Sequence, residues 1–287
     1  MSKYVIITDS SSDLTKNIVG EYDLVTLQLD VLVEGEEPCP NNEVDVKEFY
    51  DKLRGKKNAS TSAVNIDKFH EIFEPYLAEG TDVLYLGFSS GLSGTYNAGL
   101  VAAKELADKY PERKIYALDT LAASLGQGLL VYYALKMQSE GADIDAVRDF
   151  IEENKINLCH WFTVDDLFFL KRGGRVSAAT AVVGSMLSIK PVLHVDNKGR
   201  LINMTKARGR KAAIDALFDK MKETAIDPET QTVFISHGDV REDAEYLAER
   251  IKNELGVKDI RIDYVGPVIG AHAGPGVLAL FYLGTER

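Results

Sequence analysis

Short apolar runs alternate with longer amphipathic segments along the first half of the chain, and this alternation constrains the fold more than any other feature. The apolar runs indicate strands at 4–9, 24–33, 82–88 and 114–119. Apolar residues at three- and four-residue spacing indicate helices at 45–54, 66–80, 93–110, 121–141 and 143–155. Strands that alternate with helices of this length are joined by crossover connections, so the pattern predicts a mostly parallel sheet.

The second half contains more strands for each helix. Strands are expected at 156–164, 191–196, 201–207, 232–238, 259–266 and 276–283, and helices at 177–188, 208–225 and 241–255. The turn "NKGR" joins two of these strands as an antiparallel hairpin. The sequence therefore predicts an α/β fold of two domains, residues 1–156 with a mostly parallel sheet and residues 157–287 with a mixed sheet whose helices lie on one face.

The charge balance narrows the classes of partner. The 287 residues carry a net charge of −11, which argues against wide contact with nucleic acid. No apolar run reaches the roughly 18 residues that a transmembrane helix needs, and the N-terminal apolar run indicates a strand rather than a secretion signal. Cys39 and Cys159 form no CxxC pair, which favours a reducing compartment, so we expect a cytoplasmic protein.

Polar side chains gather where the strands of the first half end. In an open parallel sheet, ligands bind outside the carboxyl ends of the strands. The polar residues expected at this rim are Asp9, Ser10, Ser11, Ser89, Ser90, Ser93, Asp119 and Thr120. Ser93 begins a helix, whose N–H groups and hydroxyl donors suit an anion, and Thr61 and Ser62 precede another helix. Ser93 and Thr61 are equally consistent with ordinary helix N-caps.

Nucleotide binding and serine catalysis have weaker support. No GxxxxGK[ST] loop is present, no GxGxxG follows the first strand, and "GLSGT" lacks the GxSxG spacing of a nucleophile elbow. An esterase or acyl transferase would need Ser93 as nucleophile and His272 as base, with Asp9 as the acid that orients the base. His272 lies in "GPVIGAHAGPG", which predicts a segment held by backbone constraints rather than by helix propensity.

The four histidines other than His272 have structural explanations. We expect His70 at a helix surface or in packing, His160 and His194 in strands as core or edge residues, and His237 at a strand end.

A helix in "DDLFFLKRGGRVS" should end at Gly173 and Gly174 in a left-handed cap. The basic residues near it and in the second cluster are Lys171, Arg172, Arg175, Lys206, Arg208, Arg210 and Lys211. Each cluster is a candidate for a local basic patch on an acidic protein. Arg172 and Arg175 either compensate the dipole of the helix or form a docking patch for a negatively charged partner or a phosphate.

Taken together, these segments resemble the DegV family of bacterial proteins, in family order and over nearly the whole chain. The matching segments are "TDSSSDL" (8–14), "TS" (61–62), "SSGLSGTYNA" (89–98), "DTLAASLGQG" (119–128), "DDLFFLKRGGRVS" (165–177), "IKPVLHVDNKG" (189–199), "KARGRKAA" (206–213) and "GPVIGAHAGPG" (266–276). The resemblance implies a two-domain fold whose N-terminal domain has three α/β/α layers. It also implies one long-chain fatty acid bound between the domains.

The resemblance implies that Thr61 and Ser93 hold the fatty acid carboxylate, with Ser62 and His272 beside it. In several bacteria such proteins are the FakB component of a fatty acid kinase and present the bound acid to a separate kinase subunit, which forms the acyl phosphate for phospholipid synthesis. Such a protein would have no catalysis and no cofactor or metal of its own, and would contact membranes transiently to exchange ligand. The candidates for the kinase-facing surface are Arg172, Arg175, Arg208 and Arg210.

The chain departs from the family pattern at one place. The family often has "TSQPS" where this chain has "TSAVN" (61–65), so a polar contact is lost at Ala63. Besides the fatty acid carrier, the esterase stays open, and so does a sugar- or nucleotide-binding regulator that uses the strand-end hydroxyls.

Overall fold

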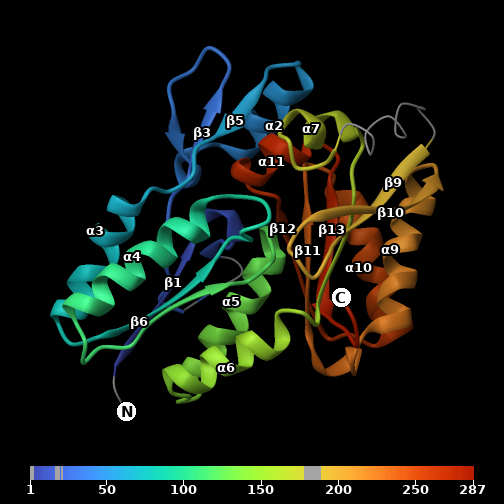
Figure 1. Cartoon of the computed structure of the whole chain (residues 1–287). Helices are drawn as coiled ribbons and strands as arrows, with labels where there is room; N and C mark the ends of the chain where they lie inside the picture. Colours follow the sequence, from blue (N-terminus) through green and yellow to red (C-terminus); the bar gives the residue numbers. More distant parts are fainter. Residues whose placement is uncertain (1–2, 17–19, 21, 178–188) are drawn as a thin grey trace.

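The computed structural model describes residues 3–16, 20, 22–177 and 189–287 (Figure 1). The helix expected at 177–188 lies outside the described residues, apart from Ser177. Within the described part, the strands form a four-stranded, a six-stranded and a three-stranded sheet.

The four-stranded sheet is parallel throughout, as the alternating pattern predicts. Its strands stand in the order β2-β1-β6-β7, namely Val25–Leu27, Tyr4–Asp9, Asp82–Gly87 and Ile115–Asp119. The strand order reverses between β1 and β6, which is where ligands bind in such sheets. Polar residues follow both β1 and β6, at the point in the sheet where a ligand site is expected.

Helices cover both faces of this sheet and make the three layers that the family resemblance implies. Neighbouring residues of a strand point to opposite faces, so Ile6 and Ile7 of β1 enter different cores. Ile7 packs with α3 (Ile66–Ala78) and α4 (Thr95–Lys109). Ile6 packs with α5 (Ser124–Ser139) and α6 (Ile144–Asn154) on the other side.

The six-stranded sheet is mixed, as predicted. Its strands stand in the order β10-β9-β8-β13-β11-β12, namely Leu201–Arg208, Ile189–Val195, Leu158–Thr163, Leu278–Leu283, Thr232–His237 and Asp259–Tyr264. Only β11 and β12 pair in parallel. The turn "NKGR" joins β9 and β10 as the expected hairpin.

Helix α5 lies between the two larger sheets, as Figure 1 shows. The helices of the second half, α9 (Arg210–Thr224) and α10 (Arg241–Leu255), cover one face of the six-stranded sheet. The other face packs on α5, which is buried on nearly all sides along most of its length because it has a sheet on either side. Gly126 of α5 is needed here, since a Cβ would lie 2.8 Å from the Phe281 ring.

The strand expected at 24–33 is wrong as a single element. The chain changes sheets within it: β2 extends the four-stranded sheet, and β3 (Asp30–Val33) joins β4 (Cys39–Pro40) and β5 (Ala59–Thr61) in the three-stranded sheet. Between them, the Leu29 N–H donates to Ser10 Oγ at 2.9 Å. A continuous apolar pattern does not reveal such a change of partner.

The remaining elements in the described part of the chain are three helices and three 3-10 turns. They are the helices α2 (Val46–Arg54), α7 (Leu167–Arg172) and α11 (Pro267–Ala273), and the 3-10 turns Ser10–Ser12, Asn41–Glu43 and Pro228–Thr230. Helix α11 packs against α7, β5 and α2. The expected domain boundary at 156/157 lies between α6 and β8 and stays a prediction.

Candidate functional site

A cavity of about 400 Å³ lies between the two halves of the chain. Its volume is within the range of pockets that hold small organic ligands. Both halves contribute walls, for example Phe88 after β6 and Phe162 of β8. Most of the lining is apolar, and a few polar side chains interrupt it: Thr61, Ser62, Ser93, Ser124, His160, Arg175 and His272.

Thr61 and His272 meet at one wall of the cavity. Thr61 ends β5, which pairs with β3 in the register Val31↔Thr61, and His272 stands near the end of α11. Thr61 Oγ1 lies 2.9 Å from His272 Nε2. Ser62 follows Thr61 along the lining, and its N–H donates to the Asp30 carbonyl at 3.1 Å. A hydroxyl and an imidazole thus stand together beside the apolar space.

The segment around His272 is a helix, so the expectation of a non-helical segment is wrong. Pro267 occupies the first turn, where its missing N–H costs nothing, and Gly274 (φ 77°) ends the helix. Gly270 is required by packing, because a Cβ would lie 2.7 Å from Tyr50 Oη. The glycines and the proline therefore shape and end a short helix rather than prevent one.

The imidazole of His272 is held neutral at pH 7. Burial lowers its pKa to about 4, and the positive charges of Arg175 and Arg172 add to this effect. Helix α7 ends against the ring: a Cβ at Gly173 would lie only 2.4 Å from His272 Nδ1. Gly174, next in the chain, takes the left-handed conformation (φ 73°) that the sequence predicts for this cap.

Ser93 lies in the turn before α4 and lines the cavity. Gly94, not Ser93, is the N-cap, and Ser93 Oγ accepts the Thr95 N–H at 3.2 Å while lying 3.0 Å from Thr95 Oγ1. Thr61 is not an N-cap either, because Asn65 caps α3 by accepting the Lys68 N–H at 3.0 Å. The hydroxyl of Thr61 is thus free of a capping role.

The other strand-end polar residues hold the loops in place, and none of them lines the cavity. The Asp9 carboxylate accepts from Tyr85 Oη at 2.7 Å and from the Phe88 N–H at 3.0 Å. Ser89 Oγ donates to the Gly199 carbonyl at 2.9 Å, which docks the loop after β6 on the β9–β10 turn. The remaining contacts are equally local: Ser11 N–H to Asp9, Ser90 and Leu121 N–H to Asp119, and Thr120 Oγ1 to the Gly87 carbonyl.

This bonding does not assemble a serine hydrolase triad. His272 pairs with Thr61, whereas the Ser93 hydroxyl pairs with Thr95. Asp9 is fully buried and engaged by Tyr85, Phe88 and Ser11, so it does not orient His272.

The four arginines named as partner-surface candidates occupy different environments. Arg175 is half-buried and lines the cavity, and its Nε donates to the Leu92 carbonyl at 3.2 Å. Arg172 is exposed and lies 4.9 Å from the Phe169 ring centroid, and Arg208 is exposed at the end of β10. Arg210 forms an ion pair with Asp243 at 2.7 Å. Sequence reasoning missed Arg175 as a lining residue, although the double glycine before it signals a chain reversal.

Of the other histidines, only His160 lines the cavity. His70 Nε2 lies 2.7 Å from Glu105 Oε2 at the surface. His194 is buried and stacks on Trp161 with ring centroids 4.9 Å apart. His237 is fully buried, and its Nδ1 accepts the Val240 N–H at 3.3 Å.

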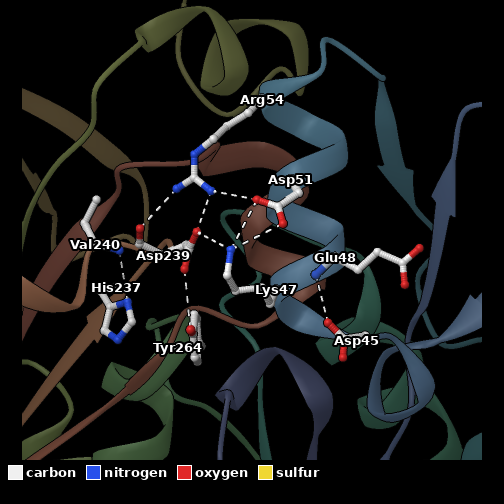
Figure 2. Close-up of polar contacts among 9 residues, drawn as sticks. All are labelled: Asp45, Lys47, Glu48, Asp51, Arg54, His237, Asp239, Val240 and Tyr264. Atoms are coloured by element: carbon white, nitrogen blue, oxygen red, sulfur yellow. Dashed lines mark hydrogen bonds and ion pairs between the residues drawn. The ribbon is translucent and has the colours of Figure 1, made fainter.

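Polar contacts between α2 and Asp239 hold this helix to the second half of the chain (Figure 2). Arg54 donates to the Asp239 carbonyl at 3.0 Å and also binds its carboxylate, which Lys47 approaches at 3.7 Å. On the same helix, Tyr50 Oη donates to the carbonyl of Val265, a lining residue, at 2.7 Å. These contacts fix α2, against which α11 and therefore His272 are positioned.

Metal-binding clusters and membrane-spanning helices are both absent from the part of the chain that the structure describes. No group of three or more His, Cys, Asp or Glu side chains is arranged to hold a metal ion there. None of the helices in residues 3–16, 20, 22–177 and 189–287 is long and apolar enough to cross a bilayer. The polar groups that line the cavity are hydroxyls, imidazoles and one guanidinium.

The chain matches known proteins over nearly its full length. The family model described as "Uncharacterised protein, DegV family" matches residues 3–285. A DegV domain-containing protein of Clostridium perfringens is 51% identical and covers 100% of this chain and 99% of its own. A Thermotoga maritima protein, whose structure is described as revealing fatty acid binding function, is 31% identical with a TM-score of 0.83, covering 98% of this chain and 99% of that one.

A third comparison supports the fold alone. The Fatty Acid Kinase (Fak) B3 protein of Streptococcus pneumoniae, loaded with linoleic acid, is 20% identical with a TM-score of 0.87. The match covers 98% of this chain and 99% of the pneumococcal one. The arrangement of sheets around the cavity is thus common to proteins of widely different sequence.

Proposed function

The chain belongs to the DegV family, and on this premise we propose that it binds one long-chain fatty acid in the cavity and presents the carboxylate to a separate kinase subunit. The observation that carries the proposal is the composition of the cavity wall. Thr61, Ser93 and His272 stand in one otherwise apolar space of about 400 Å³. Fatty acid binding in the Thermotoga maritima relative is consistent with this assignment.

The carboxylate is assigned to Thr61 and Ser93, with His272 and Ser62 beside it. Hydroxyl groups donate directional hydrogen bonds, and bonds to a charged acceptor are stronger than those between neutral groups. Arg175 lines the same cavity and stays protonated, so it supplies the positive charge that the hydroxyls lack. A carboxylate placed here also favours protonation of His272, whose pKa lies near 4 in the structure.

The acyl chain is assigned to the apolar lining. Leu170, Leu201 and Val268 are among the residues that contribute to it. Each methylene that leaves water contributes about 0.8 kcal/mol, so a long chain supplies most of the affinity and short acids bind weakly. Ala63 lines the cavity at the position where the family often has glutamine, and it adds apolar rather than polar surface.

Thr61→Val combined with Ser93→Ala tests the head-group assignment. Both replacements remove hydroxyl donors and change the volume little. Each hydrogen bond to a charged group is worth about 1.5–3 kcal/mol, so the double variant should bind palmitate at least about tenfold more weakly. Equal affinity of the wild type and the double variant, measured by titration of delipidated protein, would show that the carboxylate lies elsewhere.

Presentation to a kinase is tested by reconstitution. In the family resemblance the partner forms an acyl phosphate, and the name of the pneumococcal neighbour fits such a role. The loaded protein, a FakB-dependent kinase subunit and ATP should yield acyl hydroxamate when hydroxylamine is present, and the protein alone should yield none. Arg172 and Arg208, both exposed, are the first residues to replace at the docking surface. A cytoplasmic location stays a prediction.

A further inference from the structure

Two further polar residues, His160 and Ser124, interrupt the apolar lining. His160 projects from β8 on the same face as Phe162, since alternate strand residues share a face, and both line the cavity. The side chain is 5% exposed. Its ring packs edge-on against Phe281, with centroids 4.6 Å apart. An imidazole thus stands where the acyl chain is expected to run.

One nitrogen of this imidazole has no hydrogen-bond partner in the described part of the chain. His160 Nδ1 is buried and bonds to nothing among the described residues. Burial holds the pKa of His160 well below its usual range, with the charges of Arg287 and His194 adding to the effect, so the ring is neutral. A neutral imidazole offers one donor and one acceptor. A buried polar group without a hydrogen-bond partner is destabilising, so a ligand group that forms a hydrogen bond with the His160 ring is favoured.

The first turn of α5 faces the same region. Ala123 and Ser124 line the cavity, and α5 has no side-chain cap at Ala123. A Cβ on Gly126, in the same turn, would lie 3.4 Å from His160 Nδ1, so the helix start and the ring are close neighbours. The first N–H groups of a helix have no partner within the helix and need acceptors outside it.

The carboxyl group of Asp13, which bonds to Ser124, adds no negative charge to this region at neutral pH. Ser124 takes a left-handed conformation (φ 53°), and its hydroxyl donates to Asp13 Oδ2 at 2.5 Å and lies 3.1 Å from Ser236 Oγ. Burial raises the pKa of Asp13 to about 8, although its hydrogen bond with Ser124 opposes that rise. Asp13 and His160 are both uncharged, so the region suits a neutral polar group rather than an ion.

We propose that His160 and the first turn of α5 form a second polar subsite, which receives a hydroxyl on the acyl chain and extends the ligands of this protein to long-chain hydroxy fatty acids. The inference rests on the proposed function, because it assumes that an acyl chain occupies the cavity. A hydroxyl both donates and accepts, so it can satisfy the imidazole and a helix N–H together. A fatty acid without this group leaves His160 unpaired or bound to a trapped water.

The decisive experiment compares ligands on the wild-type protein. Delipidated protein is titrated with stearate and with positional isomers of hydroxystearate. One isomer should bind about three- to tenfold more tightly than stearate, the range expected for one added hydrogen bond. The proposal is overturned if stearate binds and no isomer binds more tightly. If neither stearate nor any isomer binds, the proposed function itself fails.

Two variants test whether the imidazole of His160 causes the preference for hydroxystearate. His160→Phe should reduce the ratio of hydroxystearate to stearate affinity to about one. His194→Phe is the matched control, because His194 is also buried, also has an unpartnered Nδ1 among the described residues, and does not line the cavity. A His160→Phe protein that keeps the preference, or a His194→Phe protein that loses it, contradicts the assignment. If His160→Phe does not fold, the isomer series on the wild type decides alone.

Discussion

A single added methyl group at Gly173 should disable the head-group site and leave the fold intact. Gly173 has φ −70° and ψ −8°, a conformation that alanine adopts readily, so Gly173→Ala introduces no backbone strain. Alanine is also favoured over glycine in helical backbone by up to about 1 kcal/mol. The new Cβ, however, would lie 2.4 Å from His272 Nδ1.

The size of the effect follows from this distance. Contacts of a Cβ below 3.4 Å are already tight, so the imidazole must move by about 1 Å. The ring borders the cavity and can move toward it. Such a shift breaks the 2.9 Å contact between His272 Nε2 and Thr61 Oγ1 and misplaces one donor to the carboxylate. Loss of one hydrogen bond to a charged group, about 1.5–3 kcal/mol, weakens binding by roughly 10- to 100-fold.

Gly174→Ala is the matched control one residue further on. Gly174 has φ 73°, which is strained for alanine by roughly 1–2 kcal/mol, and its Cβ would meet nothing within 4 Å. Palmitate titration and urea unfolding of both variants should give opposite results: Gly173→Ala loses affinity but not stability, and Gly174→Ala loses stability but not affinity. The reasoning is refuted if Gly173→Ala binds palmitate like the wild type, or if both variants lose affinity equally.

Three further predictions concern charge and pH. Burial lowers the pKa of His194, His237 and His272 to about 4, so below pH 6.5 the unfolded chain binds protons that the native state does not bind. The calorimetric Tm should therefore fall from pH 7 to pH 5, and a constant Tm would contradict this. Burial raises the pKa of Asp13 to about 8, so the native state loses stability as pH rises through 8; Asp13→Asn should remove this loss, and urea midpoints at pH 6 and pH 9 measure it. Arg175→Met should raise the pKa of His272 in an NMR titration and weaken palmitate binding, and an unchanged His272 titration would argue against their coupling.

The layered architecture could be predicted because local patterns determine it. Alternating strands and helices imply a parallel sheet, and the turn "NKGR" implies the β9–β10 hairpin; both are confirmed. The segment 24–33 could not be resolved, because an apolar pattern is the same whether a strand keeps its partner or changes sheets after Leu27. The helix around His272 was missed because glycine and proline usually interrupt helices, whereas here Gly270 allows close packing on Tyr50 and Pro267 occupies the first turn.

The candidate site could be predicted only in part. Ser93, Thr61 and His272 stand out in the sequence by residue type and by the motifs around them, and the structure brings all three to one cavity. Their contact with a carboxylate stays a prediction. Arg175 and His160 escaped notice as lining residues. His160 stands on a strand, where core and cavity-lining positions have the same pattern, whereas Arg175 lies in the turn after α7. In the structure, the face of β8 that carries His160 and Phe162 borders the cavity.

The central claim is that the chain carries one fatty acid, and lipid analysis of the protein purified from cells tests it most directly. Native mass spectrometry should show one added mass per chain in the range of a long-chain fatty acid. Organic extraction should release that acid in stoichiometric amount. Protein that is consistently without lipid, and that also takes up neither palmitate nor oleate when they are added, would contradict the account.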